Sequence, residues 1–298
     1  MKRKGRFMPR ETARVAEPIA GDGLYQERAR RALPLLVRQA ESGRPVFYSD
    51  LAEELGMPNP RNLNYPLGSI GTTLANLSKE WKQKIPPLQC LVVNKNTGLP
   101  GEGIAWFLND WGNFKALPKR QKKKIVAAEH RRIYDYPRWA EVLRFLSLQP
   151  IKQDFSDFIR KASEPALPRG GGESDRHRAL KEFVAQNPKL IGLPKKTLAG
   201  KNEVPIASGD SLDVSFCLGD EWIAAEVKTT LSDISDVTRG LFQCVKYRAV
   251  MEAVQAADGL ARNARAILVL EGKLPSDLVP LRNTLGVEVC EGISPWSG

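Results

Sequence analysis

The first half of the chain places apolar residues at intervals of three and four, the spacing of one helix face. Segments 25–41, 49–55 and 64–82 carry this pattern, and we expect a helix at each. Ser49 or Asp50 opens the second segment, and either side chain can accept a hydrogen bond from a free backbone N–H group. We therefore predict one of them as its N-cap.

Two short apolar runs follow, at 90–94 and 104–108. The segment between them, 95–103, reads KNTGLPGEG, and the pattern predicts two strands joined by a mobile hairpin. Three helices and then a hairpin is the order of a winged helix, with the second and third helices as a helix-turn-helix pair. The region resembles the winged-helix modules fused to bacterial nucleases, which predicts a mostly helical, winged-helix-like domain. Any specificity would come from the helix at 64–82 and the 95–103 loop.

A basic segment comes next and leads to three aromatic residues, Tyr134, Tyr136 and Trp139. Its charged members are Lys119, Arg120, Lys122, Lys123, Lys124, Arg131 and Arg132. Cations beside aromatic rings can contact phosphates and stack on bases, so these residues are candidates for nucleic-acid binding. The alternative is a solvated helix face that packs on the core through Ile125 and Val126.

Segment 164–172, EPALPRGGG, contains two prolines and three consecutive glycines. This composition is typical of a flexible joint and predicts a linker between domains. The chain would then consist of a basic N-terminal region at 1–163 and a second domain at 173–298. Its 298 residues are enough for both.

Beyond the linker, helices and strands alternate. We expect, in order, helix 173–187, strand 211–218, strand 221–229, helix 235–257 and strand 264–272. Gly219 and Asp220 separate the two neighbouring strands and predict a tight turn, so these strands should pair as a hairpin. The succession indicates an α/β domain.

Apolar residues make up 42% and charged residues 27% of the chain, as in a globular protein with a core. The formal net charge of +11 favours a polyanionic partner, of which nucleic acid is the commonest. A membrane surface is the competing partner. However, no apolar run is long enough to cross a bilayer, and no convincing basic amphipathic helix carries exposed aromatic residues. We therefore expect nucleic acid and no membrane.

The cysteines are scattered along the chain and include no C-x-x-C pair: Cys90, Cys217, Cys244 and Cys290. Scattered thiols fit a reducing cytoplasm, and the basic N-terminus lacks the apolar segment of a secretory signal. With two histidines and no glycine-rich phosphate-binding loop, there is little basis for a hydrolase triad or for ATP use.

The strongest candidate chemistry lies on the predicted hairpin. Asp213 belongs to its first strand, and Glu226 and Lys228 belong to its second. The two carboxylates would face each other, with the ammonium group on the same face two residues further on. Hydrolysis of a phosphodiester uses a divalent cation held by carboxylates and a positive charge near the phosphate. The alternative is a pair of surface neighbours, but the run WIAAEV is apolar on both faces, and a half-buried carboxylate needs a partner or a metal.

Asp213 in SLDVSF and Glu226-Val227-Lys228 in AAEVKT resemble the motif of the PD-(D/E)XK nucleases, the restriction-endonuclease-like superfamily. The resemblance covers about residues 173–272. It implies a restriction-endonuclease-like mixed sheet flanked by helices. Mg²⁺ or Mn²⁺ would be held by Asp213, Glu226 and the carbonyl of Val227. Lys228 would position the attacking water.

Two further pairs extend the resemblance to the RecB-like branch. Gln243 and Tyr247 in FQCVKYRAV match residues that lie beside the metal site of that branch and are associated with phosphate contacts. Glu173 and His177 stand where an acidic residue or a histidine completes the metal shell, and they share a helix face because they are four residues apart. Gln243 and Tyr247 have an alternative as ordinary helix residues. His177 could instead pack or face solvent, and Glu173 could complement the helix dipole.

A Glu-x-Lys triplet alone is weak evidence, because the chain contains three of them. Residues 80–82 fall in a helical pattern. Residues 271–273 follow Asp258 at the same interval that separates Asp213 from Glu226, but Asp258 belongs to a turn after a helix. The set around Asp213 combines adjacent strands, an acidic helix before them and a Gln-x-x-x-Tyr helix after them.

The resemblance implies a Mg²⁺-dependent phosphodiesterase, an endonuclease more than an exonuclease, with DNA favoured over RNA. Its setting would be prokaryotic defence, restriction or repair. The rival interpretation is a nuclease-like fold that binds nucleic acid or regulates without cutting. A third is a nuclease that acts only inside a complex recruited by the basic half. Cleavage of both strands of a duplex would favour a homodimer.

Overall fold

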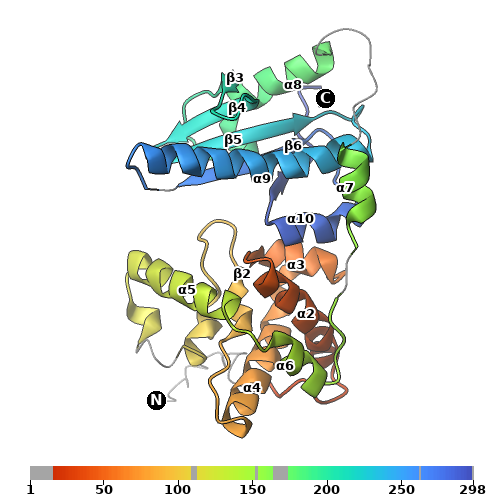
Figure 1. Cartoon of the computed structure of the whole chain (residues 1–298), viewed down its shortest axis with the longest axis vertical. Coiled ribbons are helices and arrows are strands. Elements are labelled where there is room, and N and C mark those ends of the chain that lie inside the picture. Colours follow the sequence, from red (N-terminus) through yellow and green to blue (C-terminus); the bar gives the residue numbers. More distant parts are fainter. Residues whose placement is uncertain (1–15, 109–112, 152–153, 164–173, 262, 297–298) are drawn as a thin grey trace, which may run out of the picture. The chain divides into compact units, whose positions relative to one another are not determined.

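The computed structural model describes residues 16–108, 113–151, 154–163, 174–261 and 263–296. The chain divides into two compact units, Met1–Lys152 and Gln153–Gly298, and each is described by itself (Figure 1). Within the described ranges, none of the helices combines the length and the apolar character needed to cross a bilayer.

Helices dominate the first unit. They are α2 (Leu24–Glu41), α3 (Tyr48–Glu54), α4 (Asn64–Glu80), α5 (Lys119–Tyr134) and α6 (Trp139–Phe145). The core forms where α2 packs on α4, and it includes the buried Leu33 and Leu36 of α2 and Ile70 and Leu74 of α4. Each pair is spaced by three or four residues, which is why apolar spacing correctly predicted the first three helices.

The N-cap predicted for α3 is wrong. The helix begins at Tyr48, and Phe47 stands at its N-cap without a side-chain cap. Ser49 and Asp50 lie inside the first turn, where the Ser49 hydroxyl donates to the Asp50 carboxylate at 2.7 Å. The helix starts early because the preceding residues, β1 (Val46–Phe47), are held in a strand pair up to its first turn.

The predicted wing is also wrong, because residues 88–108 form no antiparallel hairpin. They contain, in order, a 3-10 helix at Leu88–Leu91, β2 at Val92–Val93 and a 3-10 helix at Glu102–Trp106. β2 pairs in parallel with β1. Ile104 and Leu108 are 4% and 2% exposed, so this apolar run buries residues four apart, as a helical turn does. Short apolar runs do not distinguish a strand from a buried helical turn.

The second unit is built on a mixed sheet. Its strands are β3 (Lys201–Pro205), β4 (Ser211–Leu218), β5 (Glu221–Lys228), β6 (Ala264–Leu270) and β7 (Glu288–Cys290). They lie in sequence order, with β3, β4 and β5 antiparallel and β5, β6 and β7 parallel. The predicted hairpin and the strand after it are confirmed. β3 and β7 were not predicted, since β3 is mostly exposed and β7 is very short.

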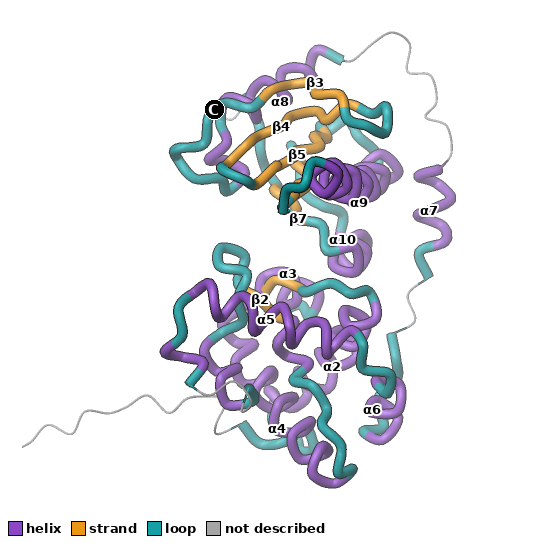
Figure 2. The backbone as a smooth tube through the Cα atoms, turned by 60° about the vertical axis from the view of Figure 1, so that its left-hand side comes forward, coloured by secondary structure: helices purple, strands orange, loops and turns teal. Residues whose placement is uncertain are grey.

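Helices cover both faces of this sheet: α7 (Ser156–Ser163), α8 (Asp175–Gln186), α9 (Ile234–Ala257) and α10 (Val279–Leu285). Figure 2 shows α8 and α9 on opposite sides of the strands. Val184 of α8 packs in one cluster with Ile223, and Leu241 of α9 packs in another with Leu268. The α/β organisation predicted for this half is therefore confirmed.

The domain boundary lies earlier than predicted. Helix α7 belongs to the second unit, where the guanidinium group of Arg239 donates to the Ala162 carbonyl at 3.1 Å. Phe155 and Phe158 pack on the same cluster as α9. The division falls at Lys152, whereas the predicted linker 164–172 lies outside the described residues. Proline and glycine content did not reveal the small apolar contact that anchors α7.

Candidate active site

The β4–β5 hairpin positions the candidate residues. Its two-residue loop contains Gly219 at φ +65°, a conformation that glycine adopts without steric cost. Strand pairing runs from Leu218↔Glu221 back to Val214↔Ala225. Beyond that point the regular pairing of β4 with β5 stops, one residue before Asp213 meets Glu226.

Side chains of β5 alternate between the two helices. Ile223, Ala225 and Val227 belong to the core on the α8 side, and Ala224 belongs to the core on the α9 side. By the same alternation Glu226 faces α9, with Lys228 beyond it. The predicted shared face of these two residues is therefore present.

Asp213 stands where β4 changes its faces. Leu212 packs with the core on the α9 side, whereas Val214 packs on the α8 side. The pairing of β4 with β3 also skips this position, and Glu203, opposite it, has φ +52°. Asp213 is thus released from the sheet, and its Oδ2 accepts a hydrogen bond of 2.9 Å from the Val227 N–H. Asp213 was expected to face Glu226 across the paired strands. It lies instead where β4 and β5 separate, beyond their last paired residues.

A hydrogen-bonded network connects β5 to α9. Lys228 Nζ donates to Glu226 Oε1 at 2.6 Å and to Gln243 Oε1 at 3.4 Å. Gln243 Nε2 lies 3.5 Å from the Tyr247 hydroxyl, which donates to the Ser211 carbonyl at 3.3 Å. The structure therefore brings the Gln-x-x-x-Tyr pair and the Glu-x-Lys pair together. Gln243 and Tyr247 therefore lie beside the Glu226–Lys228 pair, and their role there stays a prediction.

Burial controls the charges in this network. The side chain of Glu226 is 3% exposed, and burial, with a contribution from the charge of Asp213, raises its pKa to about 7 against the opposing effect of Lys228. Burial alone would lower the pKa of Lys228, but the charge and hydrogen bond of Glu226 raise it. Burial and the same carboxylate raise the pKa of Tyr247, so its phenol is neutral at pH 7. The site therefore combines a firmly charged ammonium group with a carboxyl group that titrates near neutrality.

His177 approaches Asp213 from α8. The Ser174 side chain caps this helix by accepting a hydrogen bond from the His177 N–H. The Nε2 atom of His177 lies 3.1 Å from the Val227 carbonyl oxygen and 3.7 Å from Asp213 Oδ2. The His177 side chain, 26% exposed, thus lies beside Asp213 and the Val227 carbonyl. Glu173, its predicted companion, lies outside the described residues.

The oxygen atoms at this site suit a hard divalent cation. Asp213 and Glu226 supply carboxylates and Val227 supplies a carbonyl, the donor types that Mg²⁺ prefers, and Mg²⁺ commonly uses one or two carboxylates together with waters. In the part of the chain that the structure describes, no three or more His, Cys, Asp and Glu side chains form a metal-holding group. A cation at this position would therefore depend on the two carboxylates and the carbonyl, with His177 beside them.

Gly240 is a residue that sequence reasoning missed. A Cβ atom at this position would lie 3.0 Å from Lys228 Cε and 2.8 Å from Leu268 Cδ1. The absence of a side chain lets α9 approach β5 closely enough for Gln243 to contact Lys228. A glycine inside a helical pattern is itself a signal of such close packing.

The two other Glu-x-Lys triplets have different roles. Glu80 ends α4, and Glu271 is an ion-pair partner of Arg176 that also accepts a hydrogen bond of 2.8 Å from the Thr230 N–H. Glu271 thereby ties α8 to the end of β5. Among the described residues, neither triplet has its glutamate paired with its own lysine across two residues, as Glu226 is with Lys228.

The basic residues predicted to bind nucleic acid all lie on α5. Lys119, Arg120, Lys123, Lys124 and Arg131 are exposed, while Ile125 and Val126 are buried on the opposite side. Lys122 lies over the Phe114 ring at 5.7 Å, and Arg132 pairs with the buried Glu129 at 2.7 Å. The packing role proposed for Ile125 and Val126 is confirmed, and it leaves a cationic face outside.

The site comprises a buried Glu-Lys pair held by α9 and an aspartate held between β5 and α8. Its residues come from four elements that are distant in sequence. No protein family model matches this chain, and no curated protein and no solved structure matches it either.

Proposed function

We propose that this chain is a metal-dependent nuclease of the PD-(D/E)XK type that hydrolyses phosphodiester bonds, with DNA favoured over RNA. The observation that carries the proposal is the convergence of Asp213, the buried Glu226 and Lys228 at the opening of the β4–β5 hairpin. The restriction-endonuclease-like arrangement of the sheet, the cytoplasmic location and the setting in defence, restriction or repair are parts of the same proposal.

Asp213, Glu226 and the Val227 carbonyl would hold Mg²⁺ or Mn²⁺. When bound, such an ion polarises a phosphate and acidifies a water. The remaining residues act on those ligands or on the substrate. His177 holds the Val227 carbonyl and faces Asp213, so it would orient both.

Lys228 supplies the positive charge for the phosphate and the incoming water. Gln243 holds its ammonium group from α9, and Tyr247 holds Gln243 in turn. Metal binding at Glu226 would remove negative charge from Lys228 and free its N–H donors to contact a phosphate oxygen. In the absence of a cation, Lys228 and Glu226 are therefore each other's partners in the salt bridge.

The N-terminal unit would bind the nucleic acid through α5. Five cations stand in the first turn and a half of this helix, Lys119, Arg120, Lys122, Lys123 and Lys124, and no acidic residue lies in the first turn. The helix dipole is positive at that end, so these charges destabilise the free helix and a bound polyanion would compensate them. The same charges would give an affinity that falls steeply with salt.

Substituting Lys123→Ala and Lys124→Ala together should weaken nucleic-acid binding and reduce the slope of log K against log salt by about 2. Fluorescence anisotropy over a salt series measures both. The matched control is Lys79→Ala with Lys82→Ala, which removes the same charge from exposed positions at the end of α4. Equal slopes in the two double variants would assign the effect to net charge and remove α5 as the binding face.

The cleavage rate should rise with pH through about 7, the pKa of Glu226. The carboxyl group must lose its proton before it binds a cation, so raising the Mg²⁺ concentration should move the midpoint to lower pH. Single-turnover rates measured against pH at two Mg²⁺ concentrations test this. A midpoint that does not respond to Mg²⁺ would contradict a metal-binding role for Glu226.

The direct test is a gel assay of the purified chain on single-stranded and double-stranded DNA and RNA, with Mg²⁺, Mn²⁺ or a chelator. Cleavage that needs the metal and is lost in Asp213→Asn supports the proposal. Binding without cleavage under every condition would favour a non-cutting regulatory module. The absence of both binding and cleavage would favour a nuclease that acts only in a complex. Cleavage of both strands of a duplex would favour a homodimer, and light scattering measures the oligomeric state.

A further inference from the structure

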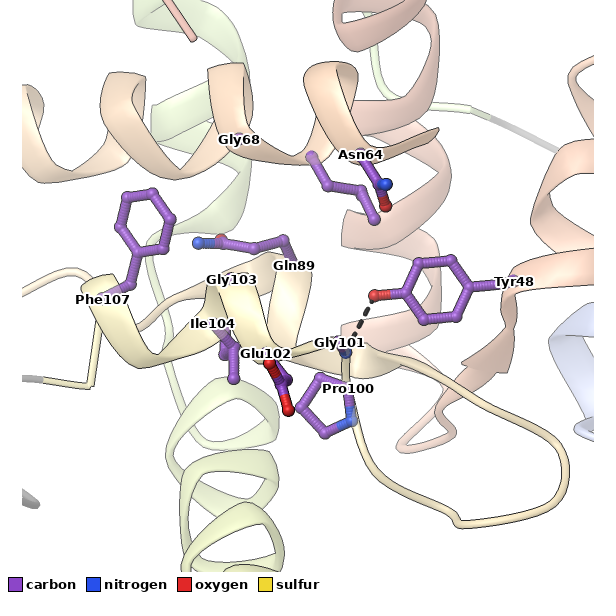
Figure 3. A pocket seen from close by; sticks show the side chains of 11 residues that line it. Tyr48, Asn64, Gly68, Gln89, Pro100, Gly101, Glu102, Gly103, Ile104 and Phe107 are labelled. Atoms are coloured by element: carbon purple, nitrogen blue, oxygen red, sulfur yellow. Dashed lines mark hydrogen bonds between the residues drawn. The ribbon is translucent and has the colours of Figure 1, made fainter. Parts of the chain in front are cut away.

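The N-terminal unit contains a pocket of about 360 Å³ that the proposed catalytic chemistry does not use. It lies between the N-terminal part of α4 and the segment from Pro100 to Phe107, with Tyr48 at one end (Figure 3). Leu67, Ile104 and Phe107 supply apolar walls, and Gln89 and Asn64 supply amides. An apolar cavity with a few fixed polar groups is the usual form of a small-ligand site.

Gln89 is the unusual member of this lining. It is 5% exposed, and neither its Nε2 nor its Oε1 has a hydrogen-bond partner among the described residues. Leaving a buried amide unpaired is unfavourable, and native proteins rarely retain one without a reason. Figure 3 shows the amide in the pocket, between the Phe107 ring and α4 at Gly68. A ligand that offers both an acceptor and a donor would satisfy it.

The chain makes room for this amide at a cost to a helix. A Cβ atom at Gly71, inside α4, would lie 2.4 Å from Gln89 Nε2 and 2.5 Å from Phe107 Cζ. Glycine in a helix interior is less favourable than alanine. The sequence thus accepts a weaker helix at the position that seats Gln89 beside an aromatic ring.

The other polar groups restrict the ligand. Tyr48 Oη accepts a hydrogen bond of 3.0 Å from the Gly101 N–H, which leaves its own proton available to the pocket. Glu102 at the rim disfavours an anionic group inside. A neutral, planar ligand with a donor and an acceptor on one edge fits these groups, because glutamine pairs with such an edge and aromatic rings stack on its face.

We infer that this pocket binds a nucleobase, through bidentate hydrogen bonds to the amide of Gln89 and contact with the ring of Phe107. The base can come from a nucleic-acid strand, in which it is unstacked, or from a free nucleoside. Helix α5 packs against the 3-10 helix that carries Gln89, with His130 Nε2 2.9 Å from the Cys90 carbonyl oxygen. The helix that carries the exposed cations, α5, therefore packs on the segment that supplies Gln89 to the pocket. The inference does not require the chain to cut nucleic acid.

The test uses the full chain and two sets of probes. Adenosine, guanosine, cytidine and thymidine are titrated by calorimetry and by saturation-transfer NMR. Short single strands of deoxyadenosine, deoxycytidine or thymidine are compared with an abasic strand of the same length, which has the same phosphate charge. Binding of a free nucleoside identifies a small-molecule source, and a preference only for base-bearing strands identifies a nucleic-acid source.

Gln89→Leu is the decisive variant. It keeps the volume of the side chain and removes the unpaired amide, so the thermal midpoint should stay equal or rise. The affinity for nucleoside or base-bearing strand should fall at least about tenfold. Gln149→Leu, at an exposed position outside the pocket, is the matched control and should bind as the wild type does.

Undiminished binding by Gln89→Leu would overturn the inference, as would the absence of any preference for base-bearing probes in the wild type. Glu226→Gln separates this result from the proposed catalysis. It should keep the nucleoside affinity whether or not the chain is a nuclease.

Discussion

Replacing Glu226 by glutamine is expected to reduce metal-dependent cleavage by at least about 10³-fold. Glutamine keeps the size of the side chain and an oxygen that can accept the hydrogen bond from Lys228 Nζ, which is 2.6 Å in the wild type. It removes the negative charge that would hold a divalent cation. Single-turnover cleavage at saturating Mg²⁺ measures the loss.

Binding of the nucleic acid should stay close to the wild-type value in this variant, since the proposed contacts lie on α5 in the other unit. Glu80→Gln is the matched control, because Glu80 belongs to another Glu-x-Lys triplet, at the exposed end of α4. It should cleave at the wild-type rate. Unchanged cleavage by Glu226→Gln would remove the site assignment.

Replacing Lys228 by methionine is expected to destabilise the second unit by about 3–5 kcal/mol, the usual cost of removing one partner of a buried ion pair. The side chains of Lys228 and Glu226 are 15% and 3% exposed, so little water can replace the lost ammonium group. Urea denaturation of the variant measures the difference in the free energy of unfolding.

The loss in Lys228→Met should depend on pH. Burial already raises the pKa of Glu226 to about 7, and removing the cation raises it further. A carboxyl group with a raised folded-state pKa stabilises the fold at low pH, and that contribution is lost as pH rises through the folded-state value. The destabilisation should therefore be small near about pH 5 and grow towards about pH 8.

Two controls separate this effect from a general loss of packing. The double variant Glu226→Gln with Lys228→Met removes both charges of the pair and should recover most of the lost stability. Asp157→Ala breaks an exposed pair with Arg160, whose side chains are 83% and 63% exposed, and should change little. Equal stability of Lys228→Met and wild type at alkaline pH would show that the pair does not hold the site together.

Much of the site follows from local pattern. Strand residues alternate between two faces, so the run around Glu226 was enough to place Lys228 beside it on one face. Helical spacing likewise placed Gln243 and Tyr247 on one side of α9. The position of Asp213 did not follow, because β4 changes faces at that residue and breaks the alternation on which the prediction depended.

The sequence by itself determined the elements whose signals are local: the long helices, whose apolar residues recur every three or four positions, and the hairpin closed by Gly219. Only the tertiary structure decided the features that depend on distant partners. β3 and β7 exist because neighbouring strands supply their hydrogen bonds, α7 joins the second unit through α9, and the predicted wing gives way to short 3-10 helices. The same holds for the unpaired amide of Gln89, because whether a buried polar group has a partner depends on chain segments that its own neighbourhood in the sequence does not contain.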